Sequence, residues 1–160
     1  MTNPSIRHTD RPRTLILPPV PYAAAIVGGW LTDRHLMQLN LNLGWATHPL
    51  AWLFIAIGLS LMIWALLHLI RHRTTFNPYL AATYLCATGP FRFSRNPIYL
   101  GDWFILVGSS LWLMTWWPIA FSPLVWAMVR YGVIHYEEEH LEAKFGDDYR
   151  NYQAKVRRWL

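Results

Sequence analysis

The sequence predicts an all-α membrane protein, a polytopic transmembrane helical bundle of about four spans followed by a cytoplasmic C-terminal helix. Three observations support this fold class: 54% of the 160 residues are hydrophobic, only 14% are charged, and basic segments alternate with nearly uncharged ones. Soluble domains rarely have such a composition. The single cysteine, Cys86, excludes an intramolecular disulfide framework and a cysteine-based zinc site.

The clearest span runs from Leu50 to Ile70, where only Ser60 and His68 are polar. A helix of this length reaches about 30 Å, the thickness of a hydrocarbon core. The other three expected spans cover residues 15–31, 98–116 and 117–136. A cleaved signal peptide is the competing interpretation of the first of these, because arginines precede it. Its prolines interrupt the apolar core and argue against cleavage.

The basic residues favour an orientation with both termini in the cytoplasm. Three arginines precede the first span, four lie in the loop between the second and third spans, and five Lys or Arg residues follow the last span. The first loop holds only Arg34, and the tight turn at 116–118 holds none. Cytoplasmic segments carry such an excess, so membrane topology rather than nucleic-acid binding accounts for the net charge of +5. This places the long loop 71–97 and the polar tail on the same cytoplasmic side, where they can meet.

Three polar motifs lie on this expected cytoplasmic side. The first, at 88–101, reads TGPFRFSRNPIYLG; the second is the acidic cluster at 137–139; the third, at 145–152, has the pattern FGxxYxxY. A plainer interpretation of the loop motif stays open. Asn96 and Pro97 can act as a helix cap and a first-turn proline, and Arg92 and Arg95 can be interfacial anchors.

Arg130 falls inside the last expected span. If one helix continues from Trp117 through Lys144, Arg130 lies on the same side as Glu137 and Glu138, because seven or eight residues make about two turns. Ionisable groups at that depth tend to pair or to line a cavity. The alternative is that Arg130 snorkels to the surface from a helix with a solvated acidic end.

Together and in order, these motifs resemble the superfamily of isoprenylcysteine carboxyl methyltransferases and phospholipid methyltransferases. The similarity covers residues 74–160 and includes EExxL at 137–141 and the basic-aromatic end at 157–159. Several linked motifs are more specific than any one of them. The resemblance is to a short, bacterial-type member. It implies one integral membrane methyltransferase-like domain, 1–160, with N-terminal spans in 1–72 and a cofactor-binding loop, helical hairpin and C-terminal helix in 73–160.

The resemblance implies S-adenosylmethionine as the cofactor, bound at the cytoplasmic face, and a lipophilic acceptor that enters from the bilayer, such as an isoprenylcysteine-like carboxylate. Glu137 or Glu138 would hold the cofactor's ammonium group, and Arg92 or Arg95 its carboxylate. Arg130 and Glu138 are the expected catalytic residues. Arg130 would contact an anionic group of the acceptor. The cofactor-binding residues that the resemblance implies are Gly89, Pro90, Arg92, Arg95, Asn96, Pro97, Tyr99, Leu100, Glu137 and Glu138.

Asn96 stands where the eukaryotic carboxyl methyltransferases have histidine, so a role that needs an imidazole charge is in doubt in this chain. Three alternative functions stay open: a phospholipid amine N-methyltransferase, an NADPH oxidoreductase like the sterol reductases, for which the chain looks short, and a non-catalytic membrane subunit. The seven histidines share no metal-ligand spacing, and no metal site is expected. The expected location is an inner membrane of bacterial type; the sequence leaves the acceptor and the oligomeric state open.

Overall fold

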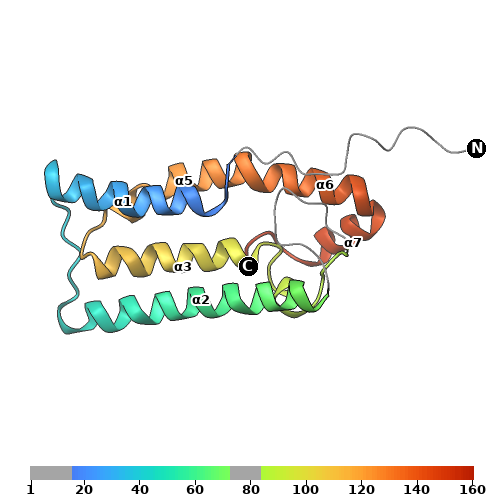
Figure 1. Cartoon of the computed structure of the whole chain (residues 1–160), viewed down its shortest axis with the longest axis horizontal. Coiled ribbons are helices and arrows are strands. Elements are labelled where there is room, and N and C mark those ends of the chain that lie inside the picture. The colour runs from blue at the N-terminus through green and yellow to red at the C-terminus, as the bar shows by residue number, and fades with distance from the viewer. Residues whose placement is uncertain (1–15, 73–83) are drawn as a thin grey trace, which may run out of the picture.

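The computed structural model describes residues 16–72 and 84–160, and the regular secondary structure of these residues is helical (Figure 1). Helices α1, α2 and α3 lie side by side with a final run made of α4, α5 and α6, and α7 folds back near α6 at one end (Figure 1). The all-α expectation is confirmed for these residues. The helices are α1 (Pro19–His35), α2 (Thr47–Arg71), α3 (Pro97–Trp112), α4 (Trp117–Ala120), α5 (Ser122–Val129), α6 (His135–Phe145) and α7 (Asp147–Lys155).

Three shorter elements complete the described chain: the 3-10 turns η1 (Gly44–Ala46) and η2 (Gly89–Arg92), and the π-helical turn η3 (Arg130–Ile134) between α5 and α6. Proline stands in the first turn of α1, α3, α4 and α5. Proline is suited to that position because its missing N–H has no partner to lose there. The prolines of the first apolar stretch therefore begin α1. The tight turn expected at 116–118 lies slightly earlier, at 113–116, and Pro118 already belongs to α4.

Small residues let α2 and α3 pack closely along their length. A Cβ atom added at Gly101 would lie 2.5 Å from Cγ of Met62 and 2.8 Å from the carbonyl oxygen of Gly58. One added at Gly108 would lie 2.9 Å from the carbonyl oxygen of Ala51. The two backbones approach each other where a side chain is absent, as membrane helices often do.

A cluster of buried apolar residues joins the first, third and last helical runs. It draws on α1, α3, α5 and η3, and α1 also contacts α4. Its members are Tyr22, Ala25, Tyr99, Leu106, Val125, Val129, Val133 and Ile134.

Within the described chain, the segment Gly44–Arg71 is the one helical segment long and apolar enough to cross a membrane, with 28 residues. Its outer face carries many exposed apolar side chains, including Trp52, Leu53, Ile63 and Trp64. Helix α1 has 17 residues and α3 has 16. At 1.5 Å per residue these two helices reach only about 24–26 Å, a little less than a typical hydrocarbon core.

Both ends of the bundle are closed by contacts between loops. At one end, the amide of Trp116 donates to the carbonyl of Leu39, and that of Leu41 donates to Met114. At the other end, the amide of Arg95 donates to the carbonyl of Arg157 at 3.0 Å. The expected meeting of the second loop with the chain that follows the last helical run is thus confirmed.

Candidate functional site

The start of α3 is tied to residues 156–160, which we call the C-terminal segment. Ser94 is buried, and its Oγ accepts a bond from the Asn96 amide and donates one to the carbonyl of Arg158, both at 3.1 Å. The Asn96 side-chain amide donates to the same carbonyl at 3.1 Å. Asn96 precedes the helix and Pro97 begins it, as the capping interpretation predicts, but the Asn96 side chain makes no capping bond.

Glu138 lies between two arginines. Nε and a terminal nitrogen of Arg158 lie 2.9 and 2.8 Å from its two carboxylate oxygens, and Arg95 lies 3.1 Å from one of them. The Arg95 and Glu138 side chains are only 11% and 15% exposed. Such a fork-shaped pair fixes orientation as well as charge, and partial burial reduces the screening by water. The cluster of these three side chains therefore carries a net positive charge.

Glu137, one residue earlier, has a different environment. The hydroxyl of Tyr99 donates to one of its carboxylate oxygens at 2.6 Å. Burial raises the pKa of Glu137 to about 7, because removal from water disfavours the charged form; the bond from Tyr99 opposes part of this rise and the charge of Glu138 adds to it. A carboxyl group poised near neutrality is a common feature of functional sites.

The FGxxYxxY motif braces this cluster from α7. Gly146 has φ 52°, a left-handed conformation that favours glycine, and it forms the turn between α6 and α7. Tyr149 is buried, and burial raises the pKa of its hydroxyl. The Tyr152 hydroxyl donates to the carbonyl of Phe91 at 2.6 Å. The motif thus fixes η2 through Tyr152.

Gly89 and Pro90 lie in η2, against the end of α2. Gly89 has φ +60°, and a Cβ atom there would lie 2.7 Å from the ring of His68. The His68 ring also shares a hydrogen bond of 2.9 Å with the Thr88 hydroxyl. The backbone at Gly89 therefore approaches His68 closely, and the buried Pro90 continues the same turn.

The structure does not bring all of the expected residues together. Arg95, Asn96, Tyr99, Glu137 and Glu138 are connected through the bonds described above. The Arg92 side chain is exposed and lies over the Phe93 ring, 4.8 Å from its centroid. Leu100 is half-buried on α3, and its amide bonds to the carbonyl of Asn96.

Arg130 lies at the start of η3, and no hydrogen bond or ion pair between described residues joins it to Glu137 or Glu138. The expected stripe assumed one unbroken α-helix. The run is instead divided at Phe121 and by the wider π-helical turn, which rotates the residues that follow it. One terminal nitrogen of Arg130 is buried without a hydrogen-bond partner among the described residues, and its guanidinium lies 5.5 Å from the Tyr131 ring centroid.

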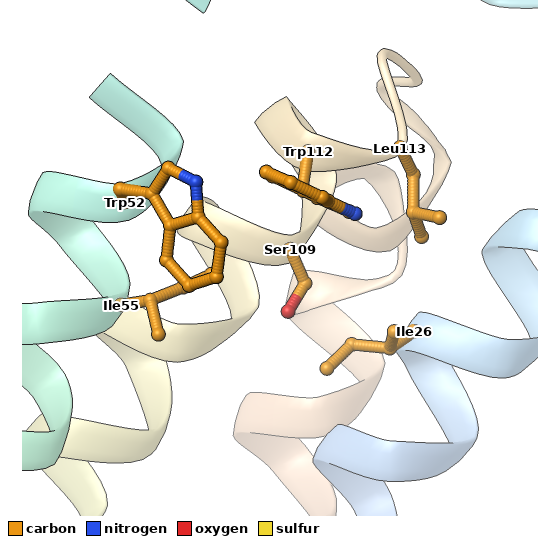
Figure 2. Close-up of a pocket in the computed structure, with 6 residues that line it drawn as sticks. All are labelled: Ile26, Trp52, Ile55, Ser109, Trp112 and Leu113. Carbon is orange, nitrogen blue, oxygen red and sulfur yellow. The ribbon is translucent and has the colours of Figure 1, made fainter. Parts of the chain in front are cut away.

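An open apolar groove of about 330 Å³ lies toward the opposite end of the bundle, between α1, α2 and α3 (Figure 2). Trp52 and Trp112 stand at its mouth, their ring centroids 4.8 Å apart, and Ser109 points in from α3 (Figure 2). None of the six residues that line it carries an acid or a base. The groove therefore lacks the charged groups of the Glu138 cluster, which is formed by Arg95, Glu138 and Arg158.

Sequence reasoning missed Ser94, Tyr149, Tyr152 and Arg158 as parts of this site. The available signals were the spacing of the two tyrosines and the basic-aromatic end of the chain, which were recognised as motifs without assigned roles. Backbone carbonyls that accept the bonds from Ser94 and Asn96 leave no trace in a sequence.

Comparison with known proteins agrees with the motifs. Residues 46–148 match the family described as phospholipid methyltransferase. A protein of Haemophilus influenzae (strain ATCC 51907 / DSM 11121 / KW20 / Rd), named only as uncharacterized, is 42% identical over 66 residues, which are 39% of this chain and all of that protein. The family match includes α2, the loop motif, α3 and both Glu137 and Glu138, and the chain therefore belongs to the phospholipid methyltransferase family.

Proposed function

We propose that the protein is an S-adenosylmethionine-dependent methyltransferase of the membrane that acts on a lipophilic acceptor. The observation that carries this proposal is the convergence of Arg95, Asn96 and Tyr99 with Glu137 and Glu138 at one end of the bundle. All five residues lie within the part of the chain that matches the methyltransferase family. Family membership supports methyl transfer as the reaction type. The cluster of these five residues supports this end of the bundle as the cofactor site.

The cluster fits the charged end of the cofactor, which carries an ammonium group and a carboxylate. Tyr99 is bonded to one oxygen of Glu137, and the other oxygen can accept from an ammonium group. Nε of Arg95 is buried and has no hydrogen-bond partner among the described residues, so it can donate to a carboxylate. Arg92 is less suitable, because it is exposed beside Phe93.

When bound, the cofactor would supply a methyl group on a positively charged sulfur, which keeps the electron pair of the broken carbon–sulfur bond as the acceptor forms the new bond. The protein's contribution to such a displacement is to position the reactants and to exclude water. The bonds from Ser94, Tyr99 and Tyr152 hold the site in one arrangement. An amine acceptor must also lose a proton before it attacks the methyl group.

For the acceptor, we propose a lipophilic molecule with an anionic group that Arg130 contacts. One terminal nitrogen of Arg130, buried and without a hydrogen-bond partner among the described residues, supports this assignment, because a donor shielded from water needs an acceptor. A carboxylate like that of an isoprenylcysteine is the first candidate. The family's description favours a second one, the amine of a phospholipid, whose phosphate group would face Arg130.

We further propose four membrane spans: α1, α2, α3 and residues 117–136, the run from α4 to the first two residues of α6. The exposed apolar side chains of α1, α2 and α5 support this arrangement, among them Val27, Leu59, Leu67 and Leu124. The arginines near the Glu138 cluster favour a cytoplasmic position for it, in a bacterial-type inner membrane with both termini inside.

Titration with S-adenosylhomocysteine, the demethylated cofactor, tests this proposal. The purified full chain should bind it saturably. Glu137→Gln should weaken binding by about tenfold or more, because an ammonium group then loses its ionic partner. Glu139→Gln is the matched control, since the Glu139 side chain is 62% exposed, and its affinity should stay within about twofold of the wild type.

Absence of saturable binding would overturn the proposal. Saturable binding of NADPH instead would favour the reductase-like alternative, and a protein that binds neither would match a non-catalytic membrane subunit.

A further inference from the structure

Arg158 forms a bidentate ion pair with Glu138. Nε lies 2.9 Å from Oε1 and a terminal nitrogen lies 2.8 Å from Oε2. The Arg158 side chain is 30% exposed and that of Glu138 15%. This geometry requires arginine, because a lysine ammonium offers one charged point and cannot make two parallel bonds.

The backbone around Arg158 is held independently of this ion pair. Three donors from the loop bind two consecutive carbonyls: the Arg95 amide binds that of Arg157 at 3.0 Å, and the side chains of Ser94 and Asn96 bind that of Arg158 at 3.1 Å. Since these bonds fix the main chain, the guanidinium group is placed beside Glu138 in advance.

Both carboxylate oxygens of Glu138 are consequently engaged. Oε1 faces Nε of Arg158 and also a terminal nitrogen of Arg95 at 3.1 Å, while Oε2 faces Arg158. A cationic ligand group at Glu138 would have to displace a guanidinium that the backbone holds in place. Glu137 presents no such obstacle, because the Tyr99 hydroxyl is its hydrogen-bond partner.

We propose that Arg158 is a positioning residue of the cofactor site: it commits Glu138 to orienting Arg95, and so leaves Glu137 as the carboxylate that receives the ligand's ammonium group. Arg95, ion-paired with Glu138, then offers its buried Nε, which has no hydrogen-bond partner among the described residues, to the ligand's carboxylate. The inference rests on the proposed function and adds a division of roles within the acidic pair, with Arg158 as its cause.

The first test measures the affinity of the purified full chain for S-adenosylhomocysteine in lipid nanodiscs. Arg158→Ala should weaken binding by about tenfold, and Arg158→Lys should restore part of the loss, because it returns the charge without the fork. Arg157→Ala is the matched control. It removes the same charge from the neighbouring position, where the side chain is exposed, and should change the affinity by less than about twofold.

The second test asks whether Arg158 acts through Glu138. In a double-mutant cycle, Arg158→Ala combined with Glu138→Gln should bind no more weakly than the weaker single variant, because both changes break the same link. Losses that multiply would show that the two residues act separately. All affinities are compared at a temperature where each variant remains folded by its melting curve, which removes a general loss of stability from the comparison.

The outcomes separate this inference from the function on which it rests. If the wild type binds and Arg158→Ala behaves like Arg157→Ala, the role of Arg158 is wrong and the proposed function stands. Tighter binding by Arg158→Ala would also overturn the inference, since Arg158 would then compete with the ligand. Failure of the wild type to bind would remove the proposed function itself, and this inference with it.

Discussion

Glu137 and Glu138 are neighbours in the chain, yet they meet different partners. Successive residues of an α-helix point about 100° apart, so Glu137 faces Tyr99 of α3 while Glu138 faces Arg95 and Arg158. Two side chains of the same chemistry thereby acquire different environments, one a carboxyl group with a raised pKa and the other an ion-paired anchor. The division of roles proposed for the site follows from this difference.

The pKa of Glu137 predicts a pH dependence of stability. The folded value of about 7 lies above the ordinary value of 4.5, so the folded protein binds the proton more tightly than the unfolded chain does. Its contribution to stability is complete below about pH 4.5 and is lost as the pH rises through 7, by up to about 1.4 kcal/mol for each pH unit in that window. The apparent melting temperature of the ligand-free protein should therefore fall between pH 5 and pH 7.5.

Glu137→Gln should reduce the slope of this profile, and Glu139→Gln should leave it unchanged, because the Glu139 side chain is exposed. A wild-type profile that the Glu137→Gln variant reproduces would show that the titrating group lies elsewhere.

At the scale of elements, the last glycine of the loop motif serves the packing of helices. Gly101 lies one turn into α3, where its missing side chain admits the backbone of α2 at Gly58. A motif that ends in glycine thus joins a candidate binding loop to a helix contact. Gly58 and Gly108 extend the same close contact along α2 and α3.

Gly101→Ala should destabilise the protein by about 1–3 kcal/mol, because its Cβ atom would overlap a backbone oxygen that cannot move alone. Gly28→Ala in α1 is the matched control. Its Cβ atom would lie an ordinary 3.7 Å from Phe121, and alanine favours the helix over glycine, so stability should hold or rise. Melting curves of the two variants in the same detergent measure the difference; equal destabilisation would contradict the packing argument.

The sequence predicted where helices lie better than it predicted where a helical run is interrupted. Apolar length located α2, and Pro97 marked the start of α3. The π-helical turn at Arg130–Ile134 was not foreseeable, since its residues have no composition that distinguishes it from an α-helix. The expected alignment of Arg130 with Glu137 assumed an unbroken α-helix, which this turn interrupts.

At the scale of the molecule, alternating charge and the order of the motifs predicted that the loop before α3 would meet the end of the chain. The bond from Arg95 to Arg157 confirms that meeting. Its details depend on which backbone carbonyls become available after folding, and a pattern of side chains does not encode them. Arg158 is the clearest case: the sequence showed a basic end, and the fold gave it Glu138 as a partner.

The most direct measurement of the central claim is transfer of a labelled methyl group. The purified protein is incubated with vesicles of a bacterial lipid extract and S-adenosylmethionine that carries a deuterated methyl group, and the lipids are analysed by mass spectrometry. The proposed function predicts a lipophilic product heavier by the labelled group, formed by the wild type and by Glu139→Gln and strongly reduced in Glu137→Gln. A lipid fraction that gains no label, or gains it equally with Glu137→Gln, would contradict the account.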